Sequence, residues 1–460
     1  MRLASLMGPD LVDALATDPA GLYDALDEFH PEDIAEIAKE LDFETTLSLL
    51  RALPEELGAA VLERLPSELR TELFEKLSKD KAVEILQEMD PDDLVDVVQE
   101  LRGEDEKLAE DLLDRLEEAD PETAEDVREL ASYPEDVAGG LMTTDYIEVN
   151  PETKVWQAID QVRHLSVEEG VETIYYLYVV YAQKLVGVVS LKDLILSDSG
   201  QQLGDLMTEN VVSVRVTDDQ ELVAATIAKY DFSALPVIDE HGNMQGVVTV
   251  DDLVDVVIEE ATEDAHKMGA VAALEEGYLE TSLVSLFRSR VTWLSLLFVG
   301  GFLTATVMER YADRLAGAIT LAIFVPLIIS SGGNSGSQSA SLIIRALAVG
   351  DVEPKDWLKV LLRELAVGLA LGLVLGGLGF ARAYFAGGPN EDPLILGAAV
   401  SVSTVGVVLV GCLCGALLPL AIQRIGLDPA VSSTPFIASL VDVLGLLIYL
   451  SIAGAVLSSA

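Results

Sequence analysis

Five long apolar segments fill the chain after residue 290, and they constrain the fold more than any other feature of the sequence. Their bounds are 291–308, 315–344, 365–381, 393–423 and 429–460. Four of them carry no charged side chain, and the last carries only Asp442. The hydrocarbon core of a bilayer needs about 20 apolar residues per helix. The sequence therefore predicts an α-helical transmembrane domain with five spans over residues 286–460.

Asp442 lies near the middle of the last segment. A charged side chain at such a depth costs roughly 2.5–3.5 kcal/mol on insertion scales, and ionisable residues inside spans mark partners, cavities or ion paths. We therefore predict a functional role for Asp442. The alternative is that it caps a broken helix or bonds to a neighbouring Ser or Thr.

The second segment is rich in Gly and Ser between residues 326 and 341, and it also contains Asn334 and Gln338. Small residues permit close packing of helices, and amides and hydroxyls line a wet path or bond across helices. Both explanations stay open from the sequence.

The net charge of the chain is −49 and is unevenly placed. Residues 287–460 contain ten basic and ten acidic side chains, so the whole excess lies in residues 1–286. Such an acidic part repels nucleic acid, whose binding depends on phosphate neutralisation, and suits hard cations such as Mg²⁺ and Ca²⁺. An acidic surface adapted to a salty cytoplasm is the alternative explanation.

Basic side chains at the ends of the expected spans indicate the topology. Seven lie on the side of the N-terminal part and three on the other. The positive-inside rule therefore predicts a multi-pass protein of the cell (inner) membrane, with cytosolic N-terminal domains and the C-terminus outside. The first thirty residues contain no apolar core, so no signal peptide is expected. The two cysteines, Cys412 and Cys414, leave no disulfide framework for the acidic part.

Helix-start signals recur through residues 1–130. A Pro or Ser with carboxylates in the following turn marks the beginning of a helix. Such starts occur at Pro31, Pro54, Pro66, Ser78 and Pro91. Short helices that each bury one face against the next form a stack. The pattern predicts an all-α superhelical N domain.

Residues 138–257 contain an internal duplication. Leu141-Met-Thr aligns with Leu206-Met-Thr, and Leu185-Val-Gly-Val-Val aligns with Met244-Gln-Gly-Val-Val. Each half predicts strand, helix, strand, Gly turn, strand and helix, which is a compact α+β unit.

The duplicated pattern resembles a tandem CBS (Bateman) pair. Such pairs commonly bind adenine nucleotides such as ATP in the clefts between their halves. The residues that fall at those clefts are Tyr175, Lys192, Asp193, Phe232 and Pro236. The alternative is that they are ordinary core and turn residues.

A helical connector is expected from residue 252 to residue 283. Asp255, Glu259 and Glu263 share one helix face. Like charges so placed destabilise a helix unless something screens them. A solvated acidic face is the alternative.

In this order the parts resemble the MgtE family of magnesium channels and transporters, over essentially the whole chain. The most specific segments begin at Gly332-Gly-Asn-Ser-Gly and Leu440-Val-Asp, and Ala261-Thr-Glu-Asp in the connector adds to them. The resemblance implies a multidomain fold of an all-α superhelical N domain, an α+β CBS pair, a connecting (plug) helix and a five-span pore domain. The corresponding boundaries are 1–130, 138–257, 258–285 and 286–460.

The resemblance implies a Mg²⁺-selective channel or transporter rather than an enzyme. Such a protein is expected to act as a homodimer and to import Mg²⁺ down its electrochemical gradient. The implied pore contacts are the carboxylate of Asp442 and the backbone near Thr434, Ala438 and Gly445. Cytosolic Mg²⁺ is expected to close the pore by bridging carboxylates. The implied regulatory ligands are Asp96, Glu100, Asp219, Glu221, Asp231, Asp252, Asp255, Glu260, Glu263, Asp264 and Asp428.

Three other functions fit parts of the sequence. A membrane-anchored metal or nucleotide sensor that transports nothing would leave Asp442 with a structural role. An intramembrane aspartyl protease needs two carboxylates in neighbouring spans, and the apolar segments supply one. An anion channel with CBS domains is disfavoured by a lone carboxylate and the absence of a basic group within the apolar segments.

Overall fold

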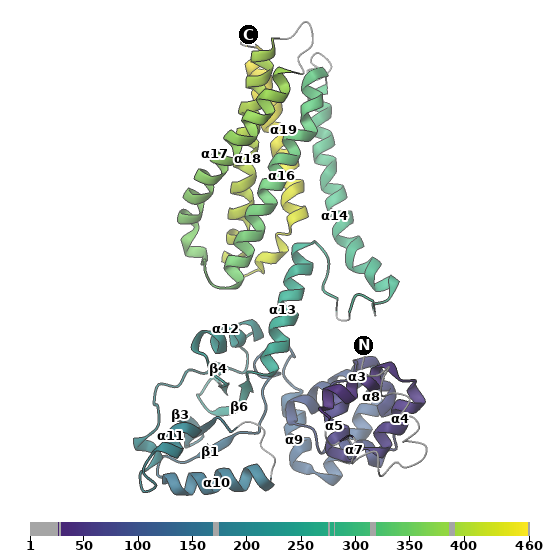
Figure 1. Cartoon of the computed structure of the whole chain (residues 1–460), viewed down its shortest axis with the longest axis vertical. Helices are drawn as coiled ribbons and strands as arrows, with labels where there is room; N and C mark the ends of the chain where they lie inside the picture. The colour runs from purple at the N-terminus through teal and green to yellow at the C-terminus, as the bar shows by residue number, and fades with distance from the viewer. Residues whose placement is uncertain are drawn as a thin grey trace. The chain divides into compact units, whose positions relative to one another are not determined.

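The computed structural model describes residue 26 and residues 29–168, 174–274, 277–279, 281–312, 319–385 and 392–458. The chain forms two compact units, Met1–Val257 and Ile258–Ala460. Figure 1 shows mostly short helices and small sheets in the first unit and long helices in the second.

The described part of the N-terminal region is entirely helical. Its helices are α3 (Pro31–Glu40), α4 (Phe43–Ala52), α5 (Glu55–Glu63), α6 (Ser67–Lys76), α7 (Lys79–Leu86), α8 (Pro91–Ala119) and α9 (Pro121–Leu130). Each short helix buries one apolar face, as Ile34 and Ile37 of α3 illustrate. A single hydrophobic core joins these faces to the second half of the following α+β region.

The predicted helix starts lie within one residue of the observed ones. Pro31 and Pro91 are first helical residues, whereas Pro54 and Pro66 lie one residue before their helices. The start of α4, which neither Pro nor Ser marks, was missed, and so was the start of α9 at Pro121. The cap of α4 is Asp42, whose Oδ1 accepts a hydrogen bond from the backbone N–H of Thr45 at 3.2 Å.

The α+β region contains two repeats of the same element order. The first is β1 (Ile147–Val149), α10 (Val155–Glu168), β2 (Tyr176–Tyr181), β3 (Lys184–Ser190) and α11 (Leu191–Leu196). The second is β4 (Val214–Arg215), α12 (Gln220–Tyr230), β5 (Ala234–Ile238), β6 (Met244–Thr249) and α13 (Asp252–Met268). In each three-stranded sheet the first pair is parallel and the second antiparallel.

The hairpin turns of the two repeats differ. The second contains Gly242 at φ 83°, as the predicted Gly turn requires. The first has Ala182 and Gln183 at φ 50° and 67° instead. The prediction of a glycine there was wrong, because the turn places non-glycine residues in the left-handed region.

The duplicated motifs pair with each other across the repeats. The N–H of Thr143, before the first sheet, donates to the carbonyl of Val247 at 2.9 Å. The N–H of Thr208, before the second sheet, donates to the carbonyl of Val188 at 2.9 Å. Each Leu-Met-Thr segment therefore extends the sheet of the other repeat.

Glycine at the middle of each Gly-Val-Val motif permits this pairing. A Cβ at Gly187 would lie 2.4 Å from Sδ of Met207, and one at Gly246 would lie 2.6 Å from the carbonyl oxygen of Thr143. Any side chain at either position would push the crossing segment away.

The connecting helix is shorter than the sequence predicts. The expected segment 258–285 is helical only to Met268, the end of α13. Ala270 adopts φ 58°, and the N–H of Val271 donates to the carbonyl of His266 at 3.0 Å. This left-handed termination ends the helix, as in a Schellman motif.

Five long helices follow in the described part of the second unit. They are α14 (Leu283–Arg310), α16 (Ile319–Ala348), α17 (Trp357–Tyr384), α18 (Pro393–Arg424) and α19 (Thr434–Ser458). Among the described residues α14, α18 and α19 are long and apolar enough to cross a membrane. The structure thus supports three candidate spans and leaves the count of five as a prediction.

Helices α16 and α18 pack so closely that glycine is required at their contact. A Cβ at Gly415 would lie 2.1 Å from the carbonyl oxygen of Gly336, and one at Gly411 would lie 2.4 Å from the carbonyl oxygen of Gly332. Small residues at helix crossings of this kind let the backbones touch. The glycines of the second apolar segment are thus used for packing.

Replacing Gly415 by alanine is expected to destabilise the protein, because the added carbon overlaps a backbone oxygen that belongs to a rigid helix. Overpacking of this kind costs about 1–3 kcal/mol. Thermal unfolding of the detergent-solubilised protein measures the effect. Gly377→Ala is the control, because a Cβ there has no neighbour within 4 Å. Equal melting temperatures for the two variants would contradict the packing argument.

Candidate functional site

The carboxylate of Asp442 lies on α19 beside a glycine of α16. Asp442 is half-buried. A Cβ at Gly333 would lie 3.8 Å from its Oδ1 and 3.7 Å from Cβ of Ala438. Glycine therefore leaves open space next to the carboxylate. Within the described chain no hydrogen bond or ion pair engages Asp442.

The other predicted pore residues have partners or packing contacts. The hydroxyl of Thr434 donates to the carbonyl of Met268 at 3.1 Å. The backbone carbonyl of Thr434 accepts a hydrogen bond from the hydroxyl of Ser337 at 3.3 Å. Gly445 is buried, and a Cβ there would lie 3.0 Å from Cγ1 of Val407 on α18. Thr434 therefore joins the end of α13 to the start of α19.

Helix α16 divides its polar residues between two sides. Asn334 and Gln338 are exposed on the surface of the unit, whereas Ser335 and Ser339 are buried. Ser339 donates to Oε2 of Glu364 on α17 at 2.7 Å. Close packing and hydrogen bonding across helices therefore each account for part of the Gly/Ser-rich segment, and a wet path along it stays a prediction. The carboxylate of Glu364 escaped the sequence analysis because it lies at the edge of its apolar segment.

A group of carboxylates surrounds the start of α8 in the first unit. Asp92 is half-buried and faces Asp252, and desolvation and this like charge raise its pKa well above the usual range. Desolvation and repulsion from Asp93 raise the pKa of Glu63 to about 7, which Arg64 only partly offsets. The sequence analysis missed Asp92, Asp93 and Glu63, since spacing along a chain does not reveal their convergence.

The two N-domain ligands predicted from the resemblance lie on α8. Desolvation and repulsion from Asp93, Glu135 and Glu100 raise the pKa of Asp96 to about 7. Glu100 already has a cation, because Nε of Arg70 donates to its Oε2 at 2.9 Å and Nη2 donates to its other oxygen. Asp96 therefore carries the less compensated charge of the two.

The predicted ligands of the second CBS repeat lie at helix ends. Oδ1 of Asp219 caps α12 by accepting from the N–H of Glu221 at 2.9 Å. Asp231 ends α12 in the left-handed region at φ 54°. Asp252, the first residue of α13, accepts from the hydroxyl of Thr249. These carboxyl groups have local structural roles.

The connector residues occur in two settings. Asp255 is exposed and Glu260 is half-buried. Farther along α13, Nζ of Lys267 lies 2.8 Å from Oε1 of Glu263 and 2.8 Å from Oδ2 of Asp428, which precedes α19. Asp264 lies in the same group, where desolvation and Asp428 raise its pKa.

The predicted nucleotide contacts come from both repeats. Tyr175, Lys192 and Asp193 belong to the first and are exposed. Oδ2 of Asp193 accepts from the hydroxyl of Ser190 at 2.7 Å, so this carboxylate helps to cap α11. In the second repeat the residues are Phe232, whose ring stacks on Tyr230, and Pro236, which is buried in β5.

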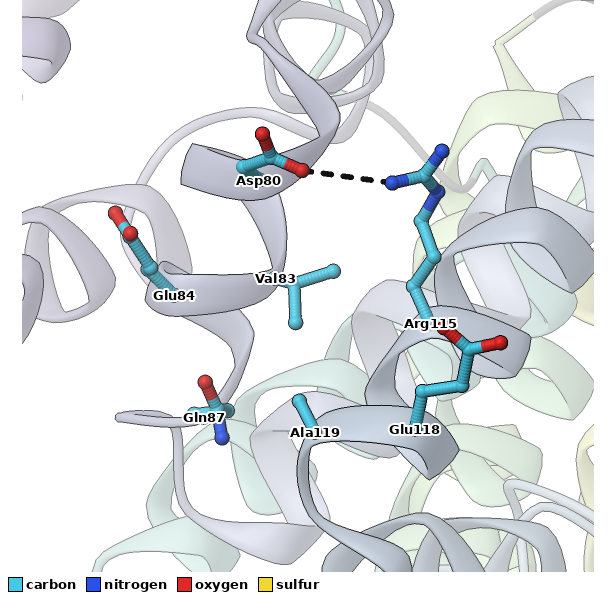
Figure 2. Close-up of a pocket in the computed structure, with 7 residues that line it drawn as sticks. All are labelled: Asp80, Val83, Glu84, Gln87, Arg115, Glu118 and Ala119. Carbon is cyan, nitrogen blue, oxygen red and sulfur yellow. Dashed lines mark hydrogen bonds and ion pairs between the residues drawn. The ribbon is translucent and has the colours of Figure 1, made fainter.

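A hollow of about 300 Å³ opens in the N domain between α7 and α8. Figure 2 shows Asp80, Glu84 and Glu118 around it, with Nη1 of Arg115 3.5 Å from Oδ1 of Asp80. None of the predicted site residues lines it. In the described ranges no three His, Cys, Asp or Glu side chains form a group that could hold a metal ion.

Family models cover most of the chain. A model described as a divalent cation transporter, MgtE, matches residues 325–452. The MgtE intracellular N domain matches residues 29–136, and the CBS domain matches residues 136–200 and 203–259.

Two solved structures are similar to part of the chain. The cytosolic domain of the Mg²⁺ channel MgtE in complex with ATP is 40% identical, with a TM-score of 0.52 over 55% of this chain and 99% of that one. The soluble part of a magnesium transporter is 31% identical, with a TM-score of 0.52 over 56% of this chain and 99% of that one.

Curated relatives match over greater lengths. The magnesium transporter MgtE of Thermus thermophilus is 43% identical over 437 residues, 95% of each chain. That of Enterococcus faecalis is 36% identical over 333 residues, 72% of each chain. An N domain, a CBS pair and a helical region with candidate membrane spans follow one another along the chain, and the chain belongs to the MgtE family of magnesium transporters.

Proposed function

We propose that the chain forms a Mg²⁺ channel whose ion site is built from Asp442. The observation that carries the proposal is the carboxylate beside Gly333, which no hydrogen bond or ion pair engages within the described residues. A helix cap or a Ser or Thr partner would have explained Asp442 structurally, and neither is present there. Similarity to magnesium transporters supports Mg²⁺ as the cargo.

Two copies of the chain would complete the site, with Asp442 of each facing a central axis. Mg²⁺ gives up its water reluctantly and is usually held through its hydration shell by few carboxylates. Two carboxylates supply the charge for outer-shell binding of such an ion. Inward movement needs no pump, because the membrane potential contributes roughly 2.3 kcal/mol per charge per 100 mV.

We extend the three supported spans to five. Helices α16 and α17 have 30 and 28 residues, which exceeds the length that a bilayer requires. Five spans place the N domain and CBS pair in the cytosol and the C-terminus outside. The domain boundaries 1–130, 138–257, 258–285 and 286–460 belong to the same proposal, although α13 ends inside the third of these segments.

Cytosolic Mg²⁺ would regulate the pore through the carboxylates of the first unit and the connector. The group around α8 supports this part, because Asp92, Glu63 and Asp96 repel neighbouring carboxylates in the folded chain. A bridging divalent ion removes that repulsion and favours the compact arrangement. The pore would therefore close as cytosolic Mg²⁺ rises.

An adenine nucleotide is proposed as a second regulator. The similar cytosolic domain was solved in complex with ATP. Tyr175 and Lys192 are exposed and offer a ring and a cation to a base and a phosphate. Phe232 offers a second ring from the other repeat.

Replacing Asp442 by asparagine is expected to reduce Mg²⁺ flux into proteoliposomes at least about tenfold, because the neutral amide removes the charge that holds the hydrated ion. Asp392→Asn is the control, since Asp392 caps α18 and asparagine can still accept from Leu394. Unchanged flux in Asp442→Asn would instead favour a membrane-anchored sensor that does not transport.

Removal of residues 1–270 is expected to leave a pore that conducts but no longer closes. The deletion takes away the acidic first unit and α13 while retaining all five long helices. Flux at micromolar and at millimolar internal Mg²⁺ should then be equal, whereas the full chain should conduct less at the higher concentration. A truncated protein that still closes with Mg²⁺ would place the sensor in the membrane domain.

Stability of the first unit is expected to fall as pH rises from about 5 to 8 in the absence of Mg²⁺. The pKa of Glu63 is about 7 in the folded chain and 4.5 as its ordinary value, so the folded form binds more protons between these limits. Ionisation across this window costs on the order of 3 kcal/mol. Hydrogen exchange of α5 and α8 in the full chain measures this loss of stability. Millimolar Mg²⁺ should remove the dependence of stability on pH.

Glu63→Gln should weaken this pH dependence, because glutamine does not ionise, while Asp92 and Asp96 still contribute to it. Glu84→Gln serves as the control, since Glu84 lies on the exposed side of α7. If exchange of α5 and α8 slows as pH rises, after correction for the intrinsic rate, the predicted loss of stability with rising pH is wrong.

A further inference from the structure

A lysine occupies the centre of the acidic group at the end of the connector. Nζ of Lys267 lies 2.8 Å from Oε1 of Glu263 and 2.8 Å from Oδ2 of Asp428. Asp264 and Arg345 also contribute to the electrostatics of the group. Burial opposes the charge on Lys267, but hydrogen bonds to Asp428 and Glu263 raise its pKa, so the ammonium remains protonated at neutral pH.

The same turn of α13 is attached to the pore helix by two further contacts. The carbonyl of Met268 accepts from the hydroxyl of Thr434, the first residue of α19, at 3.1 Å. The side chain of Met268 packs against a buried cluster that includes Ile437 and Val441. Asp442 follows Val441 directly, so the cluster on which Met268 packs extends to the turn of α19 that carries the proposed ion site.

Asp428 is held in position independently of Lys267. Its Oδ1 accepts from the N–H of Ala430 at 2.7 Å, which caps the short helix before α19. Only Oδ2 is directed to Lys267. The lysine therefore bridges a fixed carboxylate of the pore domain and a carboxylate of the connector.

We propose that Lys267 is a tethered cation that takes the place of a divalent ion between Glu263 and Asp428 and positions the end of α13 on α19 when Mg²⁺ is low. The proposal rests on the proposed function, in which bridging cations close the pore. A lysine ammonium and a hydrated Mg²⁺ both satisfy carboxylate oxygens, and the two cannot occupy one position. Lys267 is thus a positioning residue that provides basal closure and competes with Mg²⁺.

Competition between Lys267 and Mg²⁺ predicts how Mg²⁺ flux changes when Lys267 is replaced by an uncharged residue. Without Lys267, the carboxylates of Glu263, Asp264 and Asp428 repel one another until a divalent ion enters. The connector contact should then form only with Mg²⁺ bound. The ratio of flux at low Mg²⁺ to flux at high Mg²⁺ should therefore increase.

Lys267→Met and Lys267→Gln test the proposal in the full chain reconstituted into liposomes. The ratio of Mg²⁺ flux at micromolar to millimolar internal Mg²⁺ is expected to rise about three- to tenfold in both, given two charge-assisted hydrogen bonds lost. Lys267→Arg should keep the wild-type ratio. Lys359→Met is the matched control, because Lys359 is an exposed lysine that pairs with Asp356.

Hydrogen exchange of residues 263–268 gives a readout that does not depend on transport. In Mg²⁺-free buffer these amides should exchange faster in Lys267→Met than in the wild type, and millimolar Mg²⁺ should restore the wild-type rate. A lysine with only a packing role would not be replaced by an ion. Faster exchange that Mg²⁺ does not restore, or exchange and flux ratios equal to the wild type, would overturn the proposal.

The two proposals fail in different ways. If Asp442→Asn conducts normally, the pore assignment fails, and exchange at residues 263–268 still reports on Lys267. If Asp442→Asn is inactive and Lys267→Met behaves as the wild type in both measurements, only the role of Lys267 is wrong.

Discussion

The close approach of α16 to α18 is the contact on which the second unit depends. A side-chain carbon at Gly415 would overlap the carbonyl oxygen of Gly336, so the observed distance exists only with hydrogen at that position. Helix α16 also packs on α19, where Gly333 leaves space beside Asp442. The placement of the carboxylate therefore follows from glycines that never touch it. A conformational change at the proposed ion site must move α16, α18 and α19 together or break this packing.

Crowded carboxylates are the second constraint, and the fold compensates them unevenly. Arg70 neutralises Glu100 within the N domain, and Lys267 bridges Glu263 and Asp428 in the second unit. The carboxylates around the start of α8 have weaker compensation, as their raised pKa values show. Charge repulsion there acts against the folded arrangement at neutral pH. Under the proposed regulation, an added cation would relieve this repulsion.

Local sequence patterns predicted most of the architecture. Proline-marked helix starts, the duplicated Gly-Val-Val motif and the division between acidic and apolar parts each depend on neighbouring residues, and each has its counterpart in the structure. Features that depend on distant or unmarked residues were missed. The end of α13 depends on Ala270 in the left-handed region, which composition does not signal. Asp442 stands out in the sequence because its segment contains no other charge, and its role stays a proposal. The Thr434–Met268 bond joins residues too far apart for any spacing rule.

The acidic residues of the CBS repeat and those of the N domain differ in what a bound cation would displace. A cation that takes Asp219 from the N–H of Glu221 would leave the start of α12 without its cap, which costs about 1 kcal/mol. Asp231 ends the same helix. Asp96, by contrast, lies in the interior of α8 and has no cap to lose. Cation binding at Asp96 would therefore relieve repulsion without removing a helix cap. Under the proposed regulation, the N domain would respond first as Mg²⁺ rises.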